Sequence, residues 1–168
     1  KMADCYLTTM GIRSIDFDTN KGFLLNGQPF KLKGVCLHHD LGPIGAAVNV
    51  AALKRQLRLL KEMGSNAIRT SHNPPSREFL QLTDSMGFVV QVEAFDEWKV
   101  AKNLNGYHLY FDEWAEKDLR AMIRRDRNHP SVIMWSIGNE IPDTHADAHG
   151  QEITRRLVTA VRKWDYRN

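Results

Sequence analysis

The stretch "NAIRTSHNPPSREFLQLTDSMGFVVQV", residues 66–92, contains one complete unit of the pattern that decides the fold. Two short apolar runs, 66–70 and 88–92, enclose a polar loop and a segment whose apolar residues recur at helical spacing. Pro75 is typical of a helix start, and Gly87 is typical of a helix end. This order of strand, loop, helix and strand predicts two parallel strands joined by a helix that packs on their face.

The same unit is repeated on both sides of this stretch. Buried strands are expected at 32–37 and 131–137, and amphipathic helices at 49–63, 112–127 and 146–164. The repetition predicts an α/β fold with about four βα units, either half of a (β/α)8 TIM barrel or an open doubly wound sheet. No Gly-x-Gly-x-x-Gly follows the first strand and no Gly-Lys-Ser/Thr occurs, which disfavours the nucleotide-binding form of the open sheet.

The first 33 residues have a different pattern. "IRSIDFD" (12–18) alternates apolar and polar residues as a half-buried strand does, and "GFLLNGQPFKLKG" (22–34) places two apolar runs around an Asn-Gly turn. Residues 1–10 are expected to end a preceding β element and 11–33 to form a lead-in β hairpin. The barrel segment is expected to cover 32–168.

Composition excludes several classes of protein. The 168 residues carry a net charge of +3 with acids and bases interspersed, which does not indicate a nucleic-acid partner. No apolar run approaches the ~20 residues of a membrane span. The chain begins with Lys1, so a leader could lie outside it, and the compartment stays open. Two cysteines suit neither a disulfide framework nor a structural zinc site.

Polar side chains follow each of the four expected strands. In parallel α/β folds, functional sites lie at the carboxyl ends of the strands, so these residues are expected to share a pocket. They are His38, His39 and Asp40 after the first strand, Arg69, Ser71, His72 and Asn73 at the second, Glu93, Asp96, Glu97 and Trp98 at the third, and Asn139 and Glu140 at the fourth.

Several of these residues have a second interpretation. Glu140 could be a solvated loop acid, although the polar residues at the ends of the other strands favour a catalytic carboxylate. Arg69 could pair with a buried acid such as Glu93, and this role can coexist with substrate binding. His72 could bond to its own loop, and Trp98 could pack in the core rather than offer a face to a sugar.

The remaining histidines give weaker signals. Of His38 and His39, at most one is expected to face the pocket, because neighbours in an extended chain point opposite ways. His129 is expected to shape the turn into the fourth strand. His145 and His149 have the i, i+4 spacing of metal ligands, but the Glu of a His-Glu-x-x-His motif is missing, so a solvated first turn is favoured.

Long ordered motifs in the chain resemble glycoside hydrolase family 2, the family of β-galactosidases, β-glucuronidases and β-mannosidases. They are "GIRSIDFD", "GFLLNGQPFKLKGVCLHHDLGPIGAA", "LKEMGSNAIRTSHNPPSREFLQLTDSMGFVVQVEAFDEW" and "RRDRNHPSVIMWSIGNE". The resemblance implies that residues 1–10 end a β-sandwich domain and that a catalytic TIM barrel begins at residue 32. It implies a carbohydrate substrate, most consistent with a β-galactoside, and no cofactor; an accessory divalent cation and homo-oligomer formation are left open.

The resemblance also implies the roles of individual residues. Glu140 would be the general acid/base and Asn139 would bond the sugar 2-hydroxyl. The other residues implied at the substrate site are His38, Asp40, Arg69, His72, Glu93, Asp96 and Trp98. Such an acid must hold a proton near neutral pH, which requires burial or a second carboxylate nearby.

The chain departs from the family in one respect. The family's nucleophile is a second Glu on a later barrel strand, and this chain ends at Asn168, after the fourth βα unit. We therefore expect the remaining half of the barrel as a partner and expect the 168-residue chain alone to be inactive. The alternatives are a metal-dependent TIM-barrel hydrolase using His38, His39, His72 and an acid, and a non-catalytic carbohydrate-binding fragment.

Overall fold

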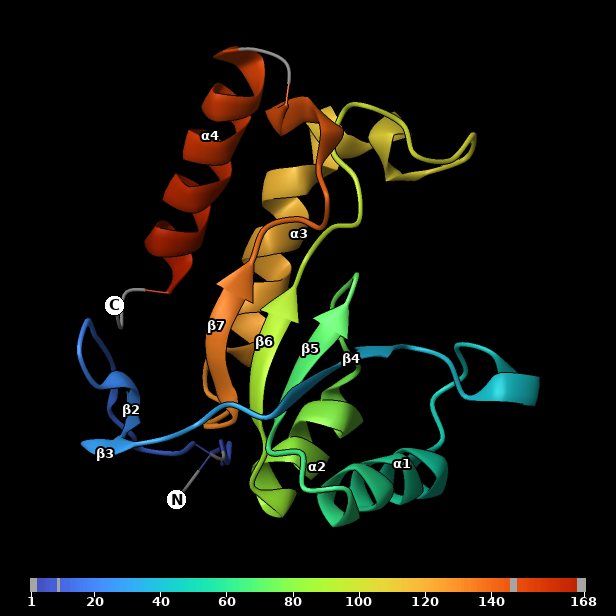
Figure 1. Ribbon diagram of the computed structural model, residues 1–168. Helices are drawn as coiled ribbons and strands as arrows, with labels where there is room; N and C mark the ends of the chain where they lie inside the picture. The colour runs from blue at the N-terminus through green and yellow to red at the C-terminus, as the bar shows by residue number, and fades with distance from the viewer. Residues whose placement is uncertain (1–2, 9, 146–147, 166–168) are drawn as a thin grey trace.

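The computed structural model describes residues 3–8, 10–145 and 148–165. Its centre is a four-stranded parallel sheet with helices packed on one face (Figure 1). The strands lie side by side in the order in which they occur along the chain. They are β4 (Gly34–His38), β5 (Ala67–Ser71), β6 (Val89–Glu93) and β7 (Val132–Ser136). Sequential parallel strands with helical connections are the architecture of a TIM-barrel segment.

The helices begin and end close to their sequence signals. They are α1 (Val50–Glu62), α2 (Arg77–Met86), α3 (Phe111–Asp126) and α4 (Ala148–Trp164), with 3-10 turns η1 (Gly42–Ile44), η2 (Tyr107–Leu109) and η3 (Pro142–Thr144). The Asn49 side chain accepts the Ala52 N–H and caps α1. Helix α2 begins after Pro75 because Ser76 is its N-cap, and Gly87 ends it in the left-handed conformation at φ +71°.

The hydrophobic core lies between the sheet and the helices. Val90 and Val92 of β6 are fully buried, as are Leu80, Leu119 and Leu157 of the three helices α2, α3 and α4. Each such side chain contributes roughly 1.5–3 kcal/mol through the apolar surface it removes from water. Packing on this face therefore holds the four strands in place.

The opposite face of the sheet is not covered by helices, and two expectations are wrong for this reason. The first strand is not buried, since Cys36 and His38 are exposed. In the fourth strand only Val132 is buried. Both strands are sheet edges among the described residues and pair on one side only.

A small antiparallel sheet precedes the parallel one. It consists of β1 (Ile15–Asp18), β2 (Gly22–Leu25) and β3 (Gln28–Pro29). Asn26 and Gly27 connect β2 to β3 with positive φ, as a tight hairpin turn requires. The Arg13 guanidinium donates to the Val132 carbonyl, so the lead-in lies against the start of β7. Residues 3–8 and 10 contain no strand or helix, and their origin in a sandwich domain stays a prediction.

Candidate active site

The face of the sheet opposite the helices, called the bare face below, carries polar side chains toward the carboxyl ends of the strands. Strand register places Cys36 opposite Arg69, and Arg69 opposite Gln91. Two residues further along each strand, His38 is opposite Ser71 and Glu93 is opposite Ser136. Because alternate residues share a face, these side chains point away from the helices. The strand exits therefore meet on one face, as the sequence predicts.

Glu93 is the centre of a buried hydrogen-bond network. Its carboxylate is fully buried, and Oε2 accepts from Arg69 Nε at 3.0 Å, Arg69 Nη2 at 2.8 Å and Ser136 Oγ at 2.7 Å. Oε1 lies 2.6 Å from His72 Nδ1. Pairing a buried carboxylate with an arginine and further donors offsets its loss of hydration. Of the two interpretations of Arg69, the ion pair with Glu93 is observed, and His72 bonds to Glu93.

The network continues from Arg69 to Asn139, which is 8% exposed. Arg69 Nη2 donates to Asn139 Oδ1 at 2.7 Å, and Asn139 Nδ2 donates to Asp96 Oδ1 at 2.9 Å. The Asn139 N–H donates to the Phe95 carbonyl at 3.0 Å. A primary amide has two N–H donors and two acceptor lone pairs, so one of each remains for a ligand.

Asp96 lies at the end of this network. Its carboxylate accepts from Lys102 Nζ at 3.0 Å as well as from Asn139. Burial alone would raise the pKa of Asp96, but these hydrogen bonds outweigh it and hold the pKa below its ordinary value. Asp96 is therefore an anion at neutral pH and acts here as an acceptor.

Glu140 directly follows Asn139, where the chain leaves β7. Its φ is +43°, in the left-handed region that residues other than glycine rarely adopt. The side chain is exposed. The burial expected to keep this carboxyl protonated is thus not provided by the described residues, because the bare face of the sheet is open beside it.

His38, the last residue of β4, and the two residues after it contact different neighbours, although both histidines line one small pocket. The His38 ring contacts the His72 ring edge-on with centroids 5.0 Å apart, whereas His39 Nε2 lies 2.8 Å from the Ala46 carbonyl in the following loop. Asp40 accepts the Gly42 N–H at 2.6 Å and closes the turn into η1. His38 therefore joins the network, while Asp40 makes no hydrogen bond to it among the described residues.

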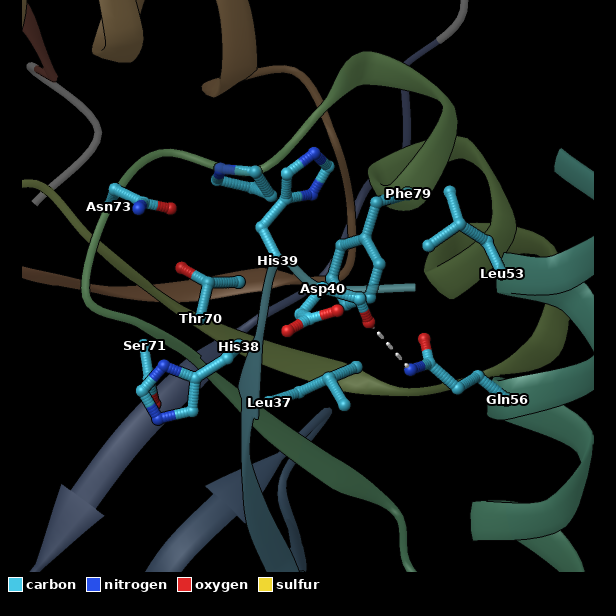
Figure 2. A pocket seen from close by; sticks show the side chains of 11 residues that line it. Leu37, His38, His39, Asp40, Leu53, Gln56, Thr70, Ser71, Asn73 and Phe79 are labelled. Atoms are coloured by element: carbon cyan, nitrogen blue, oxygen red, sulfur yellow. Dashed lines mark hydrogen bonds between the residues drawn. The ribbon is translucent and has the colours of Figure 1, made fainter. Parts of the chain in front are cut away.

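A small pocket lies beside the network, where β4 and β5 end near α1 and α2 (Figure 2). His39 and Asp40 are among the residues that line it, and the Gln56 amide donates to the Asp40 carbonyl at 3.4 Å. A second pocket, between the exits of β5 and β6 and α3, is lined by His72 and Asp96 together with Phe95 and Tyr107. Network side chains thus line both pockets, His38 the first and His72 and Asp96 the second.

Trp98 is not placed as a sugar platform. It is 2% exposed, and its indole N–H donates to the Ile137 carbonyl at 2.8 Å. Its ring packs near Phe111 in the core, with ring centroids 6.1 Å apart. Expecting Trp98 to line the substrate site was therefore wrong for this chain, and the packing interpretation applies.

Two other expected residues have structural roles. Glu97 is buried and accepts the backbone N–H groups of Lys102 and His108 at 2.7 and 2.8 Å. Burial would raise the pKa of Glu97, but these bonds lower it to about 2. His129 Nδ1 lies 2.6 Å from Asp84 Oδ2, which ties the turn before β7 to α2 as expected.

Three residues of the site were not anticipated. Ser136 binds Glu93, Lys102 binds Asp96, and Arg69 Nη1 donates to Cys36 Sγ at 3.6 Å. This bond lowers the pKa of the Cys36 thiol. Strand alternation could have placed Ser136 on the face of Glu93, but no sequence signal pointed to Lys102, which lies in an irregular loop.

The described residues give no metal site. Among them, no group of three or more His, Cys, Asp or Glu side chains could hold a metal ion. His145 and His149 flank residues 146–147, which lie outside the described ranges, so their expected helical spacing is not tested. No helix in the described part of the chain is long and apolar enough to cross a membrane.

Carboxylates, an arginine and imidazoles at the strand exits of a TIM-barrel segment are the arrangement with which the class of barrel enzymes binds polar substrates. The sequence profile "Glycosyl hydrolases family 2, TIM barrel domain" matches residues 18–167. The chain belongs to glycoside hydrolase family 2.

Individual relatives agree with this assignment. Beta-galactosidase BoGH2A of Bacteroides ovatus is 55% identical over 151 residues, and beta-glucuronidase of Streptococcus agalactiae is 38% identical over 160 residues. The alignments cover 90% and 89% of this chain, but only 18% and 26% of those proteins. The crystal structure of a family 2 member from Bacteroides cellulosilyticus superimposes with a TM-score of 0.89 and 48% identity, covering 93% of this chain and 20% of that one. The chain thus spans about a fifth to a quarter of the length of these proteins.

Proposed function

We propose that this chain is a portion of a longer protein, called the intact protein below. The intact protein is proposed to be a retaining exo-glycosidase that hydrolyses terminal β-galactosides, with Glu140 as general acid/base. The observation that carries the proposal is the anchoring of Asn139, which leaves Glu140 at the exit of β7 beside a fixed polar network. Family membership supports glycoside hydrolysis, and the 55% identity to a protein named beta-galactosidase supports the galactoside. Relatives named beta-glucuronidase make the glucuronide the competing substrate.

The reaction divides between two carboxyl groups. Glu140 would protonate the leaving oxygen and then activate water, while a carboxylate from a later barrel strand, about 5 Å away, attacks the anomeric carbon. Covering the exposed Glu140 with the other half of the barrel would supply the burial that keeps it protonated. The 168-residue chain without that half is proposed to be inactive.

The network residues would bind and orient the sugar. The free amide hydrogen of Asn139 suits the 2-hydroxyl, a contact that can strengthen in the transition state. His38, Asp40 and His72 would contact other hydroxyls. Arg69 and Glu93 are proposed to contribute mainly by fixing Asn139 and His72, since they bond to each other and to these two residues. Asp96 is proposed to fix the Asn139 amide through Oδ1.

The experiment compares nitrophenyl β-galactoside and β-glucuronide hydrolysis by the intact protein, by Glu140→Gln and by the control Glu62→Gln. Glu62 lies on the exposed side of α1, 3.6 Å from Arg58. We expect galactoside turnover that falls by about 10²–10⁴-fold in Glu140→Gln only. Preference for the glucuronide would overturn the substrate assignment. Full activity of Glu140→Gln would overturn the catalytic one, and sugar binding without turnover would favour a binding module.

A further inference from the structure

The peptide unit that precedes Glu140 is held by a side chain from another loop. Lys102 lies between β6 and α3, and its Nζ is 2.7 Å from the Asn139 carbonyl oxygen and 3.0 Å from Asp96 Oδ1. The Lys102 side chain is only 21% exposed. An ammonium group between a carbonyl and a carboxylate makes charge-assisted hydrogen bonds, which are stronger than neutral ones.

This contact acts directly on the backbone conformation of Glu140. The Asn139 carbonyl and the Glu140 nitrogen belong to the same planar peptide unit, so the direction of the carbonyl is coupled to φ of Glu140. That φ is +43°, a conformation that persists for a residue other than glycine only when its surroundings enforce it. Lys102 is the cation that holds the carbonyl in this direction.

The loop that carries Lys102 is itself fixed. The Lys102 N–H donates to Glu97 Oε2, and Glu97 Oε1 accepts from His108 further along the loop. A methyl group at Gly106 would clash with Glu97 Oε1, so the loop closes tightly around this buried carboxylate. The Lys102 backbone is therefore anchored, and little loop freedom is lost when Nζ binds Asn139.

We infer that Lys102 is a positioning residue that orients the Asn139–Glu140 peptide so that Glu140 can transfer its proton to the leaving oxygen. The inference rests on the proposed function. Lys102 acts through the backbone and through Asp96, which also holds the Asn139 side chain. Its loss should impair protonation of the leaving group more than binding of the sugar.

The test uses the intact protein with phenyl and 2,4-dinitrophenyl β-galactosides. Phenoxide departs slowly unless it is protonated, whereas dinitrophenolate needs little general-acid help. Lys102→Met should lower kcat/KM for the phenyl substrate by about 30-fold, and for the dinitrophenyl substrate by no more than about threefold. Lys102→Arg should keep most of the kcat/KM for the phenyl substrate that Lys102→Met loses, because a guanidinium can donate to both the Asn139 carbonyl oxygen and Asp96 Oδ1.

Lys99→Met is the matched control. Lys99 lies in the same loop, but its Nζ pairs with Asp112 at 2.9 Å, away from Asn139. It should change neither rate by more than about twofold. If Lys102→Met does not fold, Lys102→Gln is tested in its place. This variant keeps an N–H donor, so it should also lose kcat/KM selectively for the phenyl substrate, but by a smaller factor.

The outcomes separate this inference from the proposed function. Equal losses on both substrates, or no recovery in Lys102→Arg, would overturn the positioning role. Glu140→Gln is measured in parallel and should be more selective than Lys102→Met against the phenyl substrate. If Glu140→Gln loses no activity on either substrate, the proposed function itself fails, whatever the Lys102 variants do.

Discussion

Replacing Glu93 should destabilise the protein more than replacing any exposed acid. Glu93→Ala removes a fully buried carboxylate whose oxygens meet Arg69 twice, Ser136 and His72. Breaking a buried ion pair costs about 3–5 kcal/mol. The Arg69 side chain is 28% exposed, so water can rehydrate it, and we expect about 3 kcal/mol, at the low end of that range.

Glu93→Gln refines this expectation. With its amide oxygen at the Oε2 position, the variant can keep the bonds from Arg69 and Ser136, but it loses the negative charge. The expected cost is about 1.5–2 kcal/mol, the worth of a charge-assisted hydrogen bond. Urea unfolding followed by tryptophan fluorescence measures both variants, with Glu62→Gln as an exposed control expected to cost under about 0.5 kcal/mol. If Glu93→Ala costs no more than the control, Glu93 is not the anchor of the site.

Two further predictions concern the loops around the site. The pKa of Glu97 is lowered from 4.5 to about 2, so its ionised form stabilises the fold above pH 4.5 and this contribution is lost as pH falls toward 2. The urea midpoint of the unchanged protein should therefore fall between pH 5 and 2, and Glu97→Gln should make this fall smaller. An equal fall in both proteins would contradict the role of Glu97. A methyl group at Gly138 would lie 2.6 Å from Ile141 Cγ1, so Gly138→Ala should cost about 1–3 kcal/mol in the same assay. Gly34→Ala, whose nearest contact is 3.5 Å, should be nearly neutral, and equal costs at both glycines would refute the steric reason.

Local signals made most of the fold predictable. The caps Asn49 and Ser76 and the left-handed Gly87 act within a few residues, so helix ends could be located from sequence. The exposure of β4 could not be predicted in the same way. An apolar strand such as 32–37 looks the same in sequence whether or not another strand and helix cover it, and here they do not.

The candidate site was predictable as a location and less so as a set of contacts. Parallel strands bring their carboxyl ends together, so the meeting of Arg69, Glu93 and Asn139 followed from the strand pattern. The direction of a side chain in an irregular loop depends on tertiary packing. For that reason Trp98 was placed in the pocket although it is buried, and Lys102 was not anticipated.

Glu140 as the acid/base of a retaining glycosidase is tested most directly by Glu140→Ala with azide. Without its general base, the variant should hydrolyse the glycosyl-enzyme intermediate slowly, and azide can attack that intermediate without base assistance. We predict that azide accelerates turnover of 2,4-dinitrophenyl β-galactoside by the intact Glu140→Ala protein and yields the β-galactosyl azide. No acceleration, or an α-galactosyl azide, would contradict the role assigned to Glu140.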